Sequence, residues 1–444
     1  MKVINETKVL LNLESEKRIN RLRSLLSNLL KSGFFHIFGS NTINQIVNFA
    51  HGILIVRVMS RSDYGIYGYA LSIFQFFLLL SGFGMVSAIM QLASECADDA
   101  EKAKSLLQYS YRFGLKFNTI LSVLILLTSL FIQLPIQGSN VLLGMMFLLP
   151  ILLVFKDLQI VWLRVNLKNR EFSAVNTTNA VIFSASTILG ALAFRSVGII
   201  ISHYLVAAFM IILLWKHYHI PFIGPGQPLT GKDKKDLFQI AGVFTINDAL
   251  SQVLGLVGLL FLGMYVQDMN TIASFKVATT IPLALNFIPS ALVVYVYPHF
   301  ARHKDDINWV KEKYSQMILF VIIGNLLITL GGVVLAEPII RIMFGNTYID
   351  SIHSFRILMW SYFFSGTFRT ISGNLLVSQR VVKFNLVIGF IGALTSIVFN
   401  ITLIPVYGAV GAAYAQLITS IVTGLIATSA LIITITFRRN QKHG

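Results

Sequence analysis

The sequence predicts an all-α integral membrane protein with about twelve transmembrane helices, arranged as two six-helix lobes related by a pseudo-two-fold axis along the membrane normal. Three observations predict this fold: an apolar composition, a regular series of long apolar spans, and a pattern of positions repeated between the two halves. Of the 444 residues, 55% are hydrophobic and only 12% are charged, and the mean hydropathy is +0.73. A soluble protein of this length needs far more polar surface.

Apolar spans of about 20 residues, the length that crosses the hydrocarbon core as a helix, recur along the chain. They do not alternate in polarity, as the strands of a transmembrane β-barrel would, and helices satisfy their own backbone groups in lipid. In the first half we expect the spans Phe34–Val58, Tyr64–Ala93, Phe113–Leu134, Asn140–Leu163, Phe172–Phe194 and Val197–Trp215. In the second half we expect Leu237–Val266, Thr271–Phe300, Tyr314–Leu335, Ile352–Val377, Phe384–Ile404 and Gly408–Phe437.

The net charge of +16 fits either an acidic partner such as nucleic acid or the positive-inside rule of membrane proteins. With the N-terminus inside, 27 of the 35 lysines and arginines lie in the tails and loops of the inner side, four lie on the outer side and four lie within spans. This alternation requires an even number of spans. We therefore expect both termini to be cytoplasmic, and we expect no nucleic-acid partner.

The chain is predicted to divide into two lobes at its longest polar interruption, Lys216–Asp236, which contains GPGQP and GKDKKD. Thr42-Ile43-Asn44-Gln45 matches Thr245-Ile246-Asn247-Asp248 at an offset of 203, and Pro135 matches Pro338 at the same offset. We expect a basic segment at 1–33, an N-lobe at 34–216, a cytoplasmic linker at 217–236, a C-lobe at 237–437 and a cytoplasmic tail at 438–444. Segment 1–33 fits either an interfacial amphipathic helix or a disordered basic tail.

Enzyme signatures are absent from the sequence: there is no GxxxxGK[ST], no HExxH and no CxxC. The single cysteine, Cys96, can form neither an internal disulfide nor a thiolate cluster. We therefore expect no catalytic residue, no metal and no cofactor, and we expect a transporter rather than an enzyme.

One face of the first span is polar, because its amides and a histidine recur three or four residues apart: Asn41, Asn44, Gln45, Asn48 and His51. Amides facing lipid are costly, so this face points either at a wet cavity or at another helix to which it hydrogen-bonds. We predict Asn44 and Asn48 as substrate-binding residues. In the matching register of the seventh span, Asp248 is the candidate for ion coupling, as a cation partner or a proton carrier. The histidines on or near spans fit packed polar residues better than a switch: His36, His51 and His203.

Four cations lie inside predicted spans: Lys156, Lys276, Arg356 and Arg369. A cation at the centre of a membrane helix costs on the order of 3 kcal/mol, so each must pair, snorkel or face water. Lys156 lies beside Asp157 towards the inner end of its span, so it could snorkel to the membrane surface instead of facing a cavity. Arg369 lies deepest within its span. We predict that these cations and Arg57 line a central cavity for an anionic substrate group, since arginine binds phosphate through its planar fork.

Three segments resemble one family: Arg57-Val58-Met59-Ser60-Arg61-Ser62-Asp63-Tyr64-Gly65-Ile66-Tyr67, Ala336-Glu337-Pro338-Ile339-Ile340-Arg341-Ile342-Met343-Phe344-Gly345, and Leu403-Ile404-Pro405-Val406-Tyr407-Gly408-Ala409-Val410-Gly411-Ala412-Ala413. They are similar to the Wzx-type polysaccharide flippases of the multidrug/oligosaccharidyl-lipid/polysaccharide exporter superfamily. The first matches Arg-x-Leu-x-x-x-x-Tyr-Gly-x-Tyr with Met59 in place of the usual leucine, and the last matches Pro-x-Tyr-Gly-x-x-Gly-Ala-Ala. The resemblance covers about Phe34 to Phe437.

The resemblance implies a two-lobed exporter of the bacterial cytoplasmic (inner) membrane that works by alternating access. Its substrate would be an oligosaccharide repeat unit on an undecaprenyl diphosphate carrier, flipped to the outer leaflet for surface polysaccharide such as lipopolysaccharide O-antigen or exopolysaccharide. The implied partners are this lipid-linked oligosaccharide and membrane lipids, with a polysaccharide polymerase and a chain-length regulator as further candidates.

Four alternatives remain open from the sequence. A multidrug exporter of the same superfamily would favour an acidic lobe that binds cations, and a lipid II flippase would usually carry fourteen spans. A membrane-embedded polysaccharide polymerase would need a large outer loop with catalytic residues. A scaffold that transports nothing would not explain why cations lie within the spans.

Overall fold

The computed structural model describes residues 34–96, 99–220, 228–303, 306–379, 381 and 383–443, and these form helices and turns without a strand. The predicted segment 1–33 and part of the predicted linker, residues 221–227, lie outside the described residues. The first half of the chain forms α2 (Phe34–Val58), α3 (Arg61–Leu78), η1 (Ser81–Gly84), α4 (Met85–Glu95), α5 (Ala100–Phe131), α6 (Ser139–Met145), α7 (Leu149–Val165) and α8 (Asn169–Tyr218). The second half forms α9 (Gly231–Tyr265), α10 (Met269–Leu285), α11 (Phe287–Arg302), α12 (Ile307–Val334), α13 (Ala336–Phe344), η2 (Asn346–Tyr348), α14 (Ser351–Phe364), η3 (Ser365–Thr370), α15 (Ile371–Ser378) and α16 (Lys383–His443).

By length and composition, seven helical segments of the described residues can cross a membrane, or eight if α6 and α7, bent by 46°, form one span. Two of them, α8 with 50 residues and α16 with 61, are long enough for two crossings each. Together with the more polar α2 and the segment α14–η3–α15, this makes about twelve spans, as the sequence predicts.

The double crossings α8 and α16 are broken in the same way. Arg195 in α8 has φ 53° and ψ −134°, and Gly408 in α16 has φ 55° and ψ −130°. A residue with a side chain is strained at such angles, whereas glycine adopts them freely. The shared conformation shows that both halves build their last two spans on one plan.

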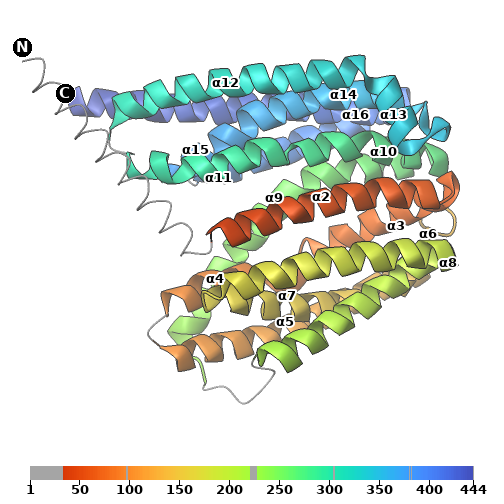
Figure 1. Ribbon diagram of the computed structural model, residues 1–444, viewed down its shortest axis with the longest axis horizontal. Helices are drawn as coiled ribbons and strands as arrows, with labels where there is room; N and C mark the ends of the chain where they lie inside the picture. Colours follow the sequence, from red (N-terminus) through yellow and green to blue (C-terminus); the bar gives the residue numbers. More distant parts are fainter. Residues whose placement is uncertain are drawn as a thin grey trace, which may run out of the picture.

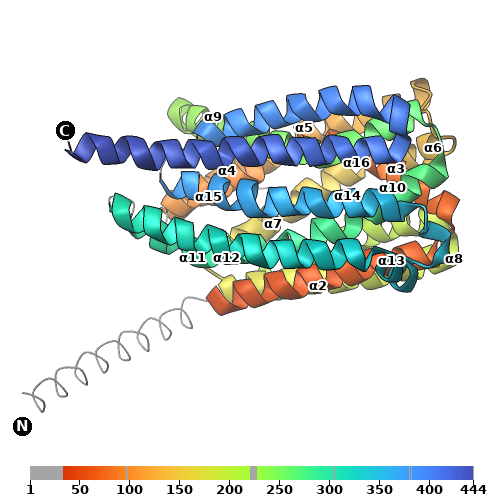
Figure 2. The same ribbon diagram turned by 90° about the horizontal axis from the view of Figure 1, so that it is seen from above.

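The helices lie lengthwise side by side, and α2 begins at the same end of the molecule at which α16 ends (Figures 1 and 2). We call this the terminal end, and the opposite end, where α2 turns into α3, the distal end. Helices α2–α8 form the N-terminal half, in which α2 packs along α8. Helices α9–α16 form the C-terminal half, in which α16 packs on α9 and α14. The two halves lie one above the other in Figure 1.

At the distal end the two halves meet through glycines on α3. A Cβ atom on Gly65 would lie 1.9 Å from the Met269 carbonyl oxygen, and one on Gly68 would lie 2.9 Å from the Lys276 Cδ. Only residues without a side chain permit backbones of membrane helices to approach this closely. The spacing of three residues places both glycines on the face of α3 that packs against α10.

At the terminal end the halves meet through the start of α9. The Phe238 ring lies 4.8 Å from the ring of Phe113 and 6.4 Å from that of Phe83, measured between centroids. Phe83 belongs to the break between α3 and α4 and has a φ of 47°. The first turns of α9 therefore rest on the N-terminal half, although α9 belongs to the other half by its contacts with α16.

Several helices begin before the predicted spans, and two of these early starts lie in polar segments that meet each other. Helix α5 begins at Ala100 because the Asp99 side chain accepts a hydrogen bond from the Lys102 backbone nitrogen, and α9 begins at Gly231, inside the predicted linker, because Thr230 accepts one from Asp233. The two extensions are joined by an ion pair of 2.8 Å between Lys102 and Asp233. The hydrogen bond from Lys102 lowers the pKa of the Asp233 carboxyl group.

Candidate functional site

A pocket of about 460 Å³ lies within the C-terminal half, between α9, α10, α14, α15 and both arms of α16. Its polar lining consists mainly of amides and hydroxyls: Asn247, Ser251, Asn286, Ser361, Tyr362, Ser365, Thr370, Asn374, Asn385, Gln416, Thr419, Ser420 and Thr423. The lining contains no aspartate and no glutamate, and its charged residue is Arg369. The pocket is therefore polar and carries one positive charge.

Arg369 stands on a π-helical turn, Ser365–Thr370, which separates α14 from α15. Turns of this kind are rare and occur frequently at functional sites, because the extra residue shifts the side chains out of the α-helical register. Arg369 as a whole residue is half-buried. Among the described residues, no carboxylate lies within ion-pair distance of it, so its charge is available to a ligand.

The π-helical turn is held from behind by α12. The Asn325 amide donates a hydrogen bond of 3.0 Å to the Thr367 hydroxyl and accepts one of 2.8 Å from the Tyr362 hydroxyl. All three groups are buried. Because these bonds fix the side of the turn that faces α12, they hold Arg369 on the opposite side, where it lines the pocket.

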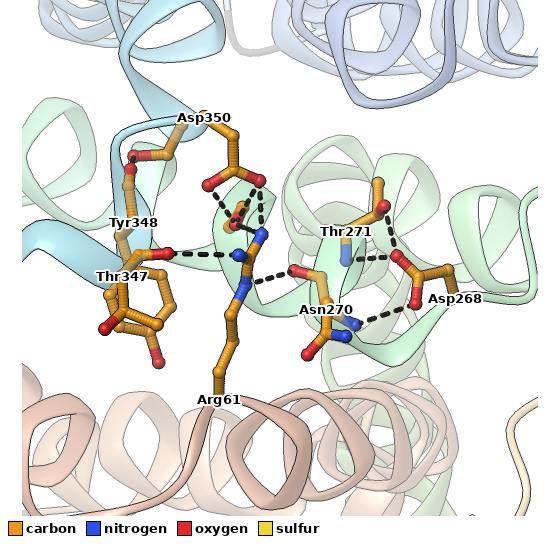
Figure 3. Close-up of polar contacts among 9 residues, drawn as sticks. Arg61, Asp268, Asn270, Thr271, Thr347, Tyr348 and Asp350 are labelled. Atoms are coloured by element: carbon orange, nitrogen blue, oxygen red, sulfur yellow. Dashed lines mark hydrogen bonds and ion pairs between the residues drawn. The ribbon is translucent and has the colours of Figure 1, made fainter.

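A second group of charges closes the distal end between the halves (Figure 3). The guanidinium of Arg61, at the start of α3, forms an ion pair with Asp350 and donates a hydrogen bond of 2.6 Å to the Ser274 hydroxyl. It also donates to the carbonyl oxygens of Asn270, at 3.3 Å, and Thr347, at 3.0 Å. One N-terminal-half arginine thus binds four groups of the C-terminal half.

Arg57 reinforces this closure at the end of α2. Its Nε donates a hydrogen bond of 2.8 Å to the Met343 carbonyl oxygen, and its guanidinium also donates to the Ile342 carbonyl oxygen. We call the contacts of Arg57, Arg61 and Gly65 with the C-terminal half the distal seal. In this conformation Arg57 is part of the distal seal and does not line the pocket that contains Arg369.

Lys276 of α10 crosses to the N-terminal half just below the seal. Its ammonium lies 5.2 Å from the ring centroid of Tyr64 and 5.4 Å from that of Tyr67. Cation–π contacts of this kind hold a cation without a carboxylate. Lys276 therefore lies at the interface of the halves, apart from the pocket lining.

The structure places the remaining predicted residues separately. Arg356 is exposed on α14 and donates to the Val333 carbonyl oxygen at 3.2 Å. Lys156 lies 3.5 Å from Asp157 on α7.

Asp248 is exposed on α9 beside the pocket residue Asn247. On α2, Asn48 is exposed, and the Oδ1 of Asn44 is buried without a hydrogen-bond partner among the described residues. Of the predicted site residues, only Arg369 lines the pocket.

The sequence interpretation did not select Asn286, Asn374, Asn385 and Gln416, which line the pocket. The signal was present, since each is an amide inside or at the end of an apolar span. An ordinary contact between two helices contains few such groups, whereas amides and hydroxyls from five helices line this one pocket.

We expect the variant Arg61→Gln to loosen the distal seal. Hydrogen bonds to a charged group contribute about 1.5–3 kcal/mol, so its loss should raise exposure of the seal roughly tenfold or more. The measurement is the rate at which a maleimide labels Ile272→Cys, which is fully buried on α10 between Asn270 and Ser274, in a Cys96→Ser background of the purified protein. Arg341→Gln is the matched control, because Arg341 pairs at 2.7 Å with Glu337 of its own helix. Equal rates in the two variants would contradict a special role for Arg61.

Similarity to known proteins shows both the family and the fold of this chain. The model of a family described as polysaccharide biosynthesis protein matches residues 54–353, which include the distal seal and end in the first turn of α14. The chain belongs to this polysaccharide biosynthesis protein family. No curated protein sequence matches the chain.

Solved structures of transporters share the fold. A multidrug resistance MATE family transporter of the MOP superfamily, in an inward-facing conformation, aligns with a TM-score of 0.72 at 15% identity over 89% of this chain and 96% of that chain. The lipid II flippase MurJ, in an inward closed conformation, aligns with a TM-score of 0.72 at 16% identity over 89% and 87%. A MOP superfamily transporter from Pyrococcus furiosus Vc1 aligns with a TM-score of 0.57 at 13% identity over 93% and 96%. The fold of this polysaccharide biosynthesis family member is thus a multi-pass transporter fold, and the predicted fold class is confirmed.

Proposed function

We propose that the protein is a flippase that moves undecaprenyl-diphosphate-linked oligosaccharide repeat units across the cytoplasmic membrane by alternating access, for the synthesis of surface polysaccharide. The observation that carries the proposal is the pocket of the C-terminal half, which combines amides and hydroxyls from five helices with the charge of Arg369 and has no acidic lining residue. Amides and hydroxyls hydrogen-bond sugar hydroxyls, and a guanidinium binds a phosphate or carboxylate group. Membership of the polysaccharide biosynthesis family supports this substrate class.

In this proposal the terminal end faces the cytoplasm, because most lysines and arginines of the loops fall on that side by the charge census. The distal seal then closes the outer face, and the conformation described here is closed towards the outside. Arg57, Lys276, Lys156, Arg356, Asn44 and Asn48 would meet the substrate only after the halves rearrange, and Asp248 is proposed to couple transport to an ion. A polysaccharide polymerase and a chain-length regulator are the proposed partners.

A multidrug exporter fits the pocket less well. An exporter of cationic drugs needs acidic groups, and the lining of this pocket has none. The transporter from Pyrococcus furiosus is described as having a binding pocket of reversed polarity that suggests a different function, which supports the idea that pocket charge separates substrate classes on this fold. A polysaccharide polymerase is disfavoured because the distal connections of the described residues are short, as between α2 and α3 or α9 and α10.

Deleting the gene in its host tests the proposal. We expect surface polysaccharide to disappear and the complete lipid-linked repeat unit to accumulate on the cytoplasmic leaflet, and we expect the wild-type gene to restore both. Loss of a polymerase would instead leave single repeat units at the cell surface. Single units at the surface, or unchanged polymer, would refute the flippase function.

A further inference from the structure

Lys276 lies at the interface of the halves, where its ammonium contacts aromatic rings rather than a carboxylate among the described residues. Its ammonium lies over Tyr64 and Tyr67 of α3, and its aliphatic chain passes within 2.9 Å of the position that a Gly68 Cβ would occupy. Among the described residues no aspartate or glutamate lies within ion-pair distance of Lys276. Its positive charge is therefore uncompensated by a carboxylate in this conformation.

Two histidines adjoin this lysine on the N-terminal side. The Nε2 of His203 in α8 lies 3.5 Å from the hydroxyl of Tyr67, the same tyrosine that holds Lys276. The Nε2 of His51 in α2 lies 2.8 Å from the Thr187 hydroxyl. The ring of Phe183 lies between the two, with its centroid 5.6 Å from that of His51 and 4.7 Å from that of His203. The flippase function proposed above uses neither histidine.

Besides Arg57 on α2 itself and the paired Glu337 and Arg341 on α13, charged and titratable groups lie on α8 and on three further helices that pack with α2 or α8. They are Asp63, Tyr64 and Tyr67 on α3, Lys156 and Asp157 on α7, Arg195 and Tyr204 on α8, and Lys276 on α10. Asp63 faces Arg195 at 3.6 Å, and Asp157 faces Lys156 at 3.5 Å, so both carboxylates already have cations. Of the cations in this group, Lys276 is therefore the one that has no carboxylate partner among the described residues.

We propose that His51 and His203 form a proton-binding site whose occupation excludes the docking of Lys276 on Tyr64 and Tyr67. Tyr67 contacts both Lys276 and His203, and two positive charges on either side of one ring in a poorly hydrated interior repel each other strongly. With Lys276 docked, the histidines remain neutral. When they take up a proton, the ammonium of Lys276 leaves the tyrosine rings, and the protonated imidazole takes its place as the cation of the cluster.

Withdrawal of Lys276 acts directly on the distal seal. Lys276 lies two residues after Ser274, which binds Arg61, and opposite Gly68, three residues after Gly65 of the seal. Since α3 and α10 form one contact surface, displacement of the lysine chain separates the helices that the seal joins. Protonation therefore favours a state open at the distal end, and deprotonation favours the closed state described here.

The test measures the distance between the halves with two spin labels and needs no substrate, so it can fail while the flippase function stands. Labels go on Val141→Cys in α6 and Val334→Cys at the end of α12, which are 66% and 72% exposed. The background is Cys96→Ser, which removes the one native cysteine. Distances are recorded by pulsed electron resonance in lipid nanodiscs at about pH 8 and about pH 5, which bracket the ordinary titration range of histidine.

On acidification we expect the population with the longer distance to grow several-fold in the otherwise native protein. The double variant His51→Gln/His203→Gln should keep its pH 8 distribution at pH 5, whereas His353→Gln, an exposed histidine of α14, should respond as the native protein does. Lys276→Met keeps an apolar chain over the tyrosine rings and has no charge for a protonated histidine to repel, so it should keep the shorter distance at both pH values. A preserved acid response in the double variant or in Lys276→Met, or no response in the native protein, would each overturn the proposal.

Discussion

Replacing Arg369 with alanine is expected to remove surface polysaccharide while the amount of protein in the membrane stays normal. Arg369 is the one charged residue in the lining of the C-terminal pocket, and the described residues offer it no carboxylate. A charge-assisted hydrogen bond contributes about 1.5–3 kcal/mol, so its loss should slow transport at low substrate concentration by about 10- to 100-fold. Removal of a partly buried cation from a polar pocket should leave the fold intact.

Two further variants separate charge from shape. Arg369→Lys keeps the charge but loses the planar fork, so we expect intermediate activity. Arg341→Ala is the matched control, since Arg341 is exposed on α13 and pairs at 2.7 Å with Glu337 of its own helix. Surface polymer is measured by immunoblot or phenol extraction, with protein level as the reference. Normal polymer in Arg369→Ala, or equal loss in Arg341→Ala, would count against the pocket as the substrate site.

Replacing Gly65 with leucine is expected to prevent the distal seal from closing. Even a Cβ atom at this position would lie 1.9 Å from the Met269 carbonyl oxygen and 2.7 Å from its carbonyl carbon. Both are backbone atoms, so neither can rotate away, and α3 and α10 must separate. Overpacking of this kind costs about 1–3 kcal/mol and more where backbone must move, which is enough to shift a balanced two-state equilibrium at least about fivefold.

The spin-label pair at Val141 and Val334 measures this effect directly. In Gly65→Leu we expect the longer distance to dominate at all pH values, together with loss of transport. Gly242→Ala is the control, because a Cβ atom at Gly242 of α9 meets nothing within 4 Å. A native distance distribution in Gly65→Leu would show that the halves tolerate the side chain and that the glycine contact does not hold the closed state.

The spans could be predicted closely from the sequence because hydropathy reports where the chain lies in lipid. The predicted first span, Phe34–Val58, coincides with α2. The helix starts of α5 and α9 could not be predicted in this way, since they are fixed by the capping side chains of Asp99 and Thr230 in polar segments that hydropathy passes over.

The candidate site was predicted only in part. Hydropathy identifies Arg369 as a deep cation, and the structure places it in a pocket. The positions of Lys276 and Arg57 depend on which helix of one half faces which helix of the other, and a single sequence does not contain this pairing. The segment Arg57–Tyr67, which carries the family resemblance, supplies the distal seal and the two tyrosines that hold Lys276.

The internal repeat, too, could be predicted only in part from the sequence. The offset of 203 relates the first helices of the two halves, as at Thr42 and Thr245. The equivalent breaks at Arg195 and Gly408 are 213 residues apart, so the register shifts within the halves. Backbone angles reveal the equivalence of the two breaks because one has a glycine and the other an arginine, which no sequence comparison would pair.

The central claim, transport of a lipid-linked glycan through the pocket of Arg369, is tested most directly with the purified protein in liposomes. The probe is a fluorescent undecaprenyl-diphosphate-linked repeat unit from the host, and the measurement is the rate at which a membrane-impermeant quencher reaches the probe of the inner leaflet. We predict that the native protein moves the probe at least about tenfold faster than Arg369→Ala and that protein-free liposomes show only slow exchange. Equal rates for the native protein and Arg369→Ala, or for the native protein and protein-free liposomes, would contradict the account.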